Sequence, residues 1–128
     1  MKLTDFEQKE YERYTEEFDF SPYLKNKTVL ITGSKGIIGS GLIRWILLEN
    51  KIHGNNTHII ASSRNPEKVP EFIENDDNVS FCKFGNEDKI TEKIDYIIHT
   101  AAPTSNKVFK EQPVESLRTI LDGAEIIL

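Results

Sequence analysis

A chain of 128 residues with a formal net charge of −5 is long enough for one domain and too short for two. Its acidic balance offers no basic stripe for nucleic acid, and no apolar run approaches the ~18 residues that cross a membrane. The N-terminus MKLTDFEQKE is polar and acidic, unlike a signal peptide, so a cytoplasmic location is predicted.

The first 26 residues are predicted to form a helical arm ahead of a domain at residues 27–128. Residues 3–17 are rich in Glu, Lys and aromatic side chains at the spacing of a solvated helix. Ser21 and Pro22 then give a turn signal between aromatic residues. We expect the segment around this turn to pack back across the edge of a sheet.

The segment TVLITGSKGIIGSGLIRWILLEN joins an apolar strand to three glycines and then to an amphipathic helical pattern. Gly33 allows a sharp turn, Gly36 lets backbone approach a phosphate without a Cβ, and Gly39 lets the helix lie close to the strand. Free N–H groups and the positive end of the helix dipole at such a turn attract anions. The strand and helix on either side favour a dinucleotide pyrophosphate over the alternative, a turn that binds nothing.

Strands and helices continue to alternate, which predicts a parallel sheet covered on both faces. Right-handed crossovers give the strand order 3-2-1-4, with the phosphate site between strands one and four. The fold class is α/β, a Rossmann-type doubly wound parallel sheet, and it is expected to be incomplete because the final helix stops on GAEIIL without a cap. The predicted strands are 27–32, 57–62, 79–84 and 95–101, and the predicted helices are 40–50, 66–74, a short turn at 87–93, and 113–128.

The cysteine and histidines give little sign of chemistry by themselves. Cys82 is the only cysteine, so no intrachain disulfide can form, and it is predicted to be a buried strand residue. His99 follows an apolar strand and is expected to pack in the core. His53 and His58 are expected in a loop and at a strand start, without an acidic residue or cysteine at ligand spacing, so no metal site is predicted.

Three motifs in order, TGSKGIIG, IDYIIHTAA and QPVESLRTILDGAEIIL, resemble those of the extended short-chain dehydrogenase/reductase family, the nucleotide-sugar epimerases and dehydratases. The resemblance runs from about Lys27 to the C-terminus. Members bind NAD or NADP with TGxxGxxG and place the DxVIHxAA strand beside the nicotinamide ribose. The matching positions are Gly33, Gly36 and Gly39 in the first motif, Asp95, His99, Ala101 and Ala102 in the second, and Pro113 and Gly123 in the third.

The chain departs from the family pattern at two positions. Ile120 stands where the family often has an asparagine. The acidic residue that contacts adenine would fall near Gly85, where Asn86 is the nearest substitute, and a plain loop role for Asn86 is the alternative. The family's catalytic YxxxK is expected only beyond Leu128, so no catalytic residue is assigned and this chain alone is predicted to be inactive.

The end of the second strand bears on the choice of cofactor. NAD-using relatives carry an Asp or Glu there, which binds the ribose hydroxyls and would repel a 2′-phosphate. This chain has Ser62 at about that position, and Arg64 is placed to hold the phosphate, with a further hydroxyl from Ser63. NADP is therefore preferred over NAD; the alternative is that Arg64 is solvated or stacks on adenine. The predicted cofactor-binding residues are Gly33, Ser34, Lys35, Gly36, Ile37, Ile38, Gly39, Ser62, Ser63, Arg64, Asn86, Ala101, Ala102 and Pro103.

The resemblance implies the cofactor-binding portion of an NAD(P)-dependent nucleotide-sugar 4,6-dehydratase or epimerase, similar to dTDP-glucose 4,6-dehydratase. It further implies a nucleotide-sugar substrate and a homodimer formed through the final helix. Two alternatives stay open. One is an NADP-binding sensor or regulator without catalysis, and the other is an interaction module that keeps only the fold.

Overall fold

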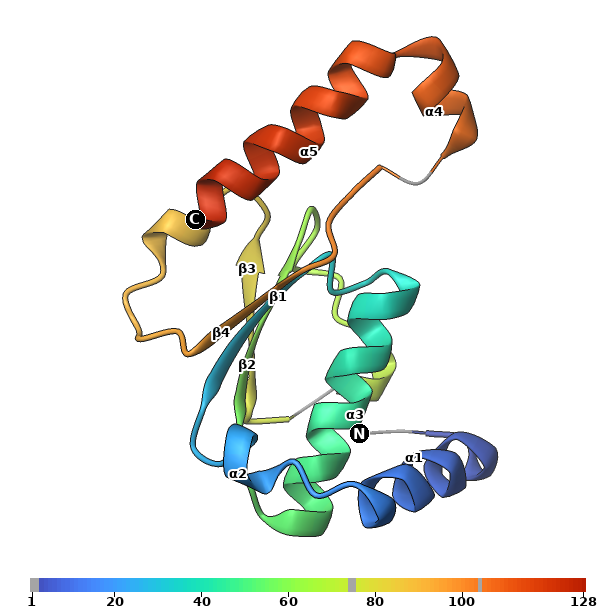
Figure 1. Ribbon diagram of the computed structural model, residues 1–128, viewed down its shortest axis with the longest axis vertical. Coiled ribbons are helices and arrows are strands. Elements are labelled where there is room, and N and C mark those ends of the chain that lie inside the picture. Colours follow the sequence, from blue (N-terminus) through green and yellow to red (C-terminus); the bar gives the residue numbers. More distant parts are fainter. Residues whose placement is uncertain (1–2, 74–75, 104) are drawn as a thin grey trace.

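A four-stranded parallel sheet in the order β3-β2-β1-β4 forms the centre of the molecule (Figure 1). The computed structural model describes residues 3–73, 76–103 and 105–128. Parallel pairing joins β1 to β2, β1 to β4 and β2 to β3, as predicted for right-handed crossovers. This confirms the α/β class and the strand order. The strands are β1 Thr28–Thr32, β2 His58–Ser63, β3 Val79–Lys83 and β4 Tyr96–His99.

The helices differ from the predicted ones in where they end and, in some places, in whether a helix is present. The first long crossover helix continues to His53, three residues beyond the prediction, because Gly54 adopts the left-handed conformation that ends it. The helix predicted at 66–74 is a single 3-10 turn, and residues 74–75 lie outside the described residues. A six-residue helix before Pro113 was not predicted. The helices are α1 Asp5–Glu17, α2 Ser21–Leu24, α3 Ile37–His53, α4 Asn106–Glu111 and α5 Pro113–Ile127, with 3-10 turns η1 Glu71–Ile73 and η2 Glu87–Lys89.

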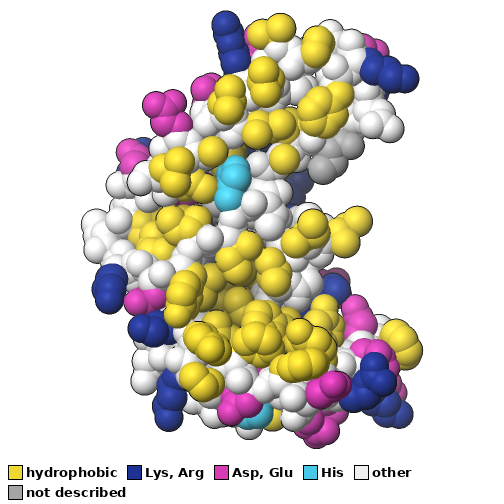
Figure 2. Space-filling model, in the orientation of Figure 1, with side chains coloured by type: hydrophobic (Ala, Val, Ile, Leu, Met, Phe, Trp, Pro, Cys, Tyr) yellow, Lys and Arg dark blue, Asp and Glu magenta, His cyan; other side chains and the backbone are white. Residues whose placement is uncertain are grey.

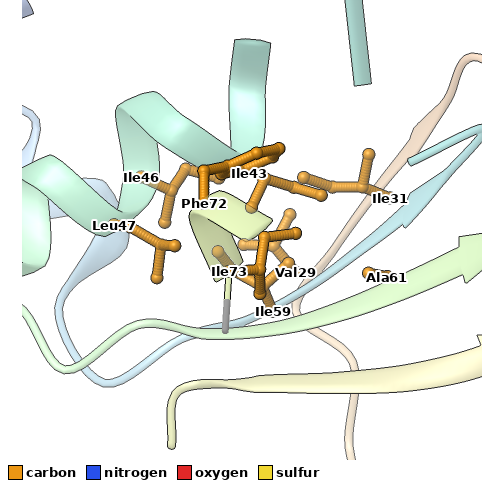
Figure 3. Packing of buried hydrophobic residues seen from close by; sticks show 9 residues of the cluster. All are labelled: Val29, Ile31, Ile43, Ile46, Leu47, Ile59, Ala61, Phe72 and Ile73. Carbon is orange, nitrogen blue, oxygen red and sulfur yellow. The ribbon is translucent and has the colours of Figure 1, made fainter. Parts of the chain in front are cut away.

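α3 and η1 cover one face of the sheet, and the hydrophobic core lies between these two elements and the sheet (Figure 3). Alternate residues of a strand point to one face, so β1 and β2 each contribute every second side chain to this cluster. Burying one such aliphatic side chain stabilises the fold by about 1.5–3 kcal/mol. The cluster consists of Val29, Ile31, Ile43, Ile46, Leu47, Ile59, Ala61, Phe72 and Ile73.

The N-terminal arm packs on α3 and not across the sheet edge, which corrects the prediction for this segment (Figure 1). The ring of Phe20 meets the indole of Trp45 edge to face, with centroids 5.1 Å apart. The Arg44 guanidinium lies 3.1 Å from a carboxylate oxygen of Glu7. The arm packs on α3 because the outer side of this helix carries Trp45, which contacts an aromatic ring of the arm, and Arg44, which pairs with an acidic residue of the arm. In the described part of the chain, every helix is too short or too polar to cross a membrane.

Asp95 fixes the start of the edge strand β4 against β1. Its carboxylate accepts the backbone N–H of Thr28 at 3.0 Å and lies 3.6 Å from Lys27 and 3.4 Å from Lys93. The Thr28 hydrogen bond, followed by the two lysine charges, holds the pKa of Asp95 below its usual 3.8. The ionised carboxylate therefore stabilises the folded state.

Replacing Asp95 with Asn is expected to make the free energy of unfolding fall less steeply as the pH is lowered into the acidic range (the acid limb). Because the folded-state pKa is lowered, the stabilisation is present above about pH 4 and is lost as the pH falls through the folded-state value. Urea unfolding between pH 2 and 7 measures this, with Glu111→Gln as the control for loss of an exposed carboxylate. An acid limb in Asp95→Asn as steep as that of the wild type would contradict the prediction.

Candidate functional site

Two glycines where β1 passes into α3, one in the loop and one in the first turn of the helix, leave no room for a side chain. Gly33 has a φ of 68°, and a Cβ there would lie 2.8 Å from the backbone nitrogen of Ala101. A Cβ at Gly39 would lie 2.4 Å from the Gly33 carbonyl oxygen, whereas one at Gly36 would lie 3.2 Å from the same oxygen. The geometry thus gives Gly33 the sharp turn and Gly39 the close approach that the sequence predicts.

The first turn of α3 leaves backbone N–H groups for an acceptor outside the helix. Gly36 is the N-cap and supplies no side chain, and the first intrahelical bond runs from the Ser40 N–H to the Gly36 carbonyl. Ile37 and Ile38 are 95% and 67% exposed. Figure 2 shows the surface hollowed beside this end of α3, below the α4 and α5 segment. Free backbone N–H groups directly after a glycine turn are the hydrogen-bond donors that a bound phosphate requires.

Thr32 ties the end of β1 to the chain that leaves β4. Its hydroxyl oxygen accepts the N–H groups of Thr100 at 3.2 Å and Ala101 at 3.3 Å, and it lies 2.7 Å from Nδ1 of His99. His99 is half-buried, and its Nδ1 lies within hydrogen-bond distance of the Thr32 hydroxyl.

Ser62 is turned inward, toward a carboxylate that sequence analysis missed. Its hydroxyl donates to Oε1 of the buried Glu87 at 2.5 Å, and the Gly85 N–H donates to Oε2 of the same carboxylate at 2.7 Å. The carbonyl oxygen of Ser62 accepts the N–H of Ser34 at 3.1 Å, and this hydrogen bond joins the glycine loop to β2. The only sequence signal for Glu87 is its place two residues after the glycine that follows β3.

The loop after β2 carries the residues predicted to select the cofactor. Arg64 is exposed, and none of the ion pairs among the described residues includes it. Ser63 is 7% exposed. The Lys35 ammonium donates to the carbonyl oxygen of Asn65, so this lysine bridges the glycine loop and the β2 loop.

Two further predicted segments follow β3 and β4. Asn86 lines a surface cavity of about 390 Å³ together with Ser80 and Cys82, and its amide oxygen accepts from Lys89. After β4, the chain passes the glycine loop at Ala101. Ala102 is exposed and Pro103 half-buried, while Thr104 lies outside the described residues. The structure therefore joins the glycine loop to the segments after β2 and β4, and it places Asn86 after β3, beside a separate cavity.

The YxxxK spacing does occur in the chain, at Tyr23 and Lys27, contrary to the expectation that it is absent. Tyr23 lies in α2 and Lys27 precedes β1, so both are at the amino end of the strands (Figure 1). Lys27 also pairs with Asp95 there. A five-residue strand of about 16 Å separates the pair from the glycine loop, so it cannot serve that site.

Cys82 is half-buried on the edge strand β3, which is less buried than predicted. Burial, then the charges of Glu87 and Asp88, raise the pKa of its thiol above the usual 9.0. A thiol whose pKa is raised is a poor nucleophile at neutral pH.

The chain matches one protein-family model and is similar to several known proteins. A model of the NAD dependent epimerase/dehydratase family matches residues 29–128. Proteins named epimerase family proteins from Staphylococcus aureus strains NCTC 8325, COL and N315 are each 34% identical to the chain over 84 residues. The match covers 63% of this chain and 24% of the length of each relative.

Two alanine substitutions in α3 are expected to have opposite effects. Gly39→Ala forces a Cβ to 2.4 Å from the Gly33 carbonyl oxygen and should lower the free energy of unfolding by about 1–3 kcal/mol. Gly41→Ala has its nearest neighbour, the Tyr11 hydroxyl, at 3.8 Å and should raise it by up to about 1 kcal/mol. Urea denaturation measures both, and equal destabilisation by the two variants would refute the steric account.

Proposed function

Because the chain belongs to the NAD dependent epimerase/dehydratase family, we propose that its glycine loop binds the pyrophosphate of a nicotinamide dinucleotide. The observation that supports this proposal most is the first turn of α3, which follows the glycine turn directly and has no side chain capping its N–H groups. The donor set is made of backbone N–H groups, as a pyrophosphate at a helix N-terminus requires. Glycine at positions 33 and 39 permits this turn, because a Cβ at either would clash with neighbouring backbone atoms, and the free N–H groups beside the turn fit the group.

The crossover between β1 and β4 gives the two halves of the dinucleotide separate places. The loop after β2 would hold the adenosine ribose, with Ser63 and Arg64 near it and Asn86 toward adenine. The segment of Ala101 and Pro103, held against the glycine loop by Thr32, would lie along the nicotinamide ribose. The bound ring supplies hydride transfer, while the protein positions the ring and limits access of water.

We further propose a preference for NADP over NAD. Asp or Glu at the end of β2 would repel a 2′-phosphate, and this chain has Ser62 there. The Ser62 hydroxyl is committed to Glu87, so recognition of the phosphate falls to Arg64 and Ser63. Arg64 is exposed, and its guanidinium can make two parallel hydrogen bonds to a phosphate.

For the whole protein we propose a nucleotide-sugar 4,6-dehydratase or epimerase of the dTDP-glucose 4,6-dehydratase kind. Its support is the family match and the TGxxGxxG, DxVIHxAA and Pro-to-Gly motifs. The matched segment covers 24% of the length of the relatives, and the catalytic tyrosine and lysine are expected beyond Leu128. This chain by itself is therefore proposed to bind cofactor without turning over a sugar.

We also propose that α5 joins two copies of the protein in a homodimer. Val114, Leu117 and Leu121 repeat at three- and four-residue steps and are 61%, 58% and 58% exposed. Such a stripe is costly to leave in water. A two-fold arrangement would bury the same face on both copies.

Arg64→Ala is expected to weaken NADPH binding about 10- to 100-fold, the loss of one or two charged hydrogen bonds, and NADH binding less than about threefold. Fluorescence titration of the reduced cofactors measures both affinities. Arg118→Ala, which removes an exposed arginine of α5, is the control and should change neither. Equal losses for both cofactors would refute the NADP preference, and a folded wild-type chain that binds neither would refute the proposed function.

Leu117→Glu is expected to shift the protein from dimer to monomer, because it places a charge on the apolar stripe of α5. Sedimentation velocity across a range of concentrations measures this. Lys110→Glu on α4 changes charge at an exposed site off α5 and should leave the dimer intact. A wild-type monomer at high concentration would contradict the proposed interface.

A further inference from the structure

A second cluster of chemically active side chains lies at the opposite end of α3 from the glycine loop. Asp19, Glu49 and His53 each offer a ligand atom, and these atoms lie within 4.8 Å of one another. His53 is the last residue of α3, and Glu49 lies one turn earlier on the same face. Asp19 comes from the segment between α1 and α2, which meets this end of α3 (Figure 1).

This arrangement overturns the expectation that His53 lies in a loop without an acidic residue at ligand spacing. The predicted helix ended at Asn50, which left the histidine without a defined geometry. The observed helix continues until the left-handed Gly54 ends it. That single extra turn places the imidazole four residues after the Glu49 carboxylate.

One carboxylate oxygen of the cluster, and one oxygen atom in each of two neighbouring residues, are buried and lack hydrogen-bond partners among the described residues. The Glu49 side chain is 0% exposed, and its Oε1 has no partner. Oδ1 of Asn55 and Oγ1 of Thr15 also have no hydrogen-bond partner, and both residues are 0% exposed. A buried carboxylate oxygen without a hydrogen-bond partner is costly, so Oε1 of Glu49 calls for a missing partner.

The nearby donors do not remove this deficit. The Asn55 amide donates to Oε2 of Glu49 at 3.3 Å and leaves Oε1 unpaired. The Trp45 indole nitrogen has no hydrogen-bond partner either, so it does not satisfy Oε1. The buried carboxylate of Glu49 therefore keeps one oxygen open to a cation.

We propose that Asp19, Glu49 and His53 form a divalent-cation site, and that Zn²⁺ is the ion it fits best. One imidazole and two carboxylates are a donor set that zinc accepts, with ligand distances of about 2.0–2.2 Å. Two ligands of a tetrahedral zinc lie about 3.3 Å apart. Nε2 of His53 and Oε2 of Glu49 are 3.9 Å apart, so a small inward movement completes the pair.

The remaining ligands are available without refolding. Asp19 is exposed and accepts the Ser21 N–H at 2.8 Å through Oδ1, and one of its carboxylate oxygens lies within 4.8 Å of the ligand atoms of Glu49 and His53. The Thr15 carbonyl oxygen lies 3.1 Å from Nε2 of His53, and zinc would replace the hydrogen bond between them. The ion would join the N-terminal arm to the end of α3. This proposal does not depend on cofactor binding at the other end of the helix.

Zinc titration of the chelator-treated 128-residue chain, in competition with a chromophoric zinc indicator, tests the proposal. The expected result is one Zn²⁺ per chain and a higher melting temperature with zinc than without. His53→Gln and Asp19→Asn should each weaken binding at least about tenfold. His58→Gln is the matched control, because His58 contacts Ser80 and Glu92 away from the cluster.

Glu49→Gln separates loss of the ligand from loss of the fold. The neutral amide relieves the buried charge, so the metal-free variant should melt no lower than the wild type and should no longer respond to zinc. Circular dichroism of each metal-free variant verifies its fold. Absence of stoichiometric zinc binding by the folded wild type, or wild-type affinity in His53→Gln, would overturn the proposal. Equal losses in His58→Gln and His53→Gln would overturn it as well.

Discussion

The approach of α3 to the carbonyl oxygen of Gly33 is the constraint on which the rest of the structure depends. The helix can start close to the end of β1 only because Gly39 presents no side chain to that oxygen. The same turn brings Gly33 against the backbone that leaves β4, where Thr32 holds Thr100 and Ala101. The placement of α3 and the direction of its free N–H groups therefore follow from one steric fact.

Sequence analysis predicted the parts of the fold that local patterns determine. Alternating strands and helices gave the parallel sheet and its order, because right-handed crossovers leave few alternatives. The glycine spacing located the candidate anion site, because a strand, a turn and a helix meet there within a few residues. Their geometry depends on backbone sterics, which a sequence records directly.

The features that escaped prediction depend on contacts between distant segments. Apart from its place two residues after Gly85, the sequence around Glu87 does not indicate that its carboxylate turns inward to meet Ser62, 25 residues earlier. The last turn of α3 was missed because the predicted helix ended at Asn50 and His53 was expected in a loop, although Gly54 marks the true end. The Asn50 side chain instead holds the backbone of Thr57, which fixes the turn into β2. The arm was misplaced because its aromatic residues fit α3 as well as a sheet edge.

The pairing of β4 with β1 has a consequence for the order of folding. Thr32 and His99, which pair across these strands, are 67 residues apart in the chain, whereas β1 and β2 are separated by little more than α3. Closing the longer loop costs more chain entropy before any contact compensates for it. The core of β1, α3 and β2 can assemble first, with β4 joining afterwards. We therefore expect the Thr32 network to form late in folding, and the candidate anion site to be complete only when the sheet has its fourth strand.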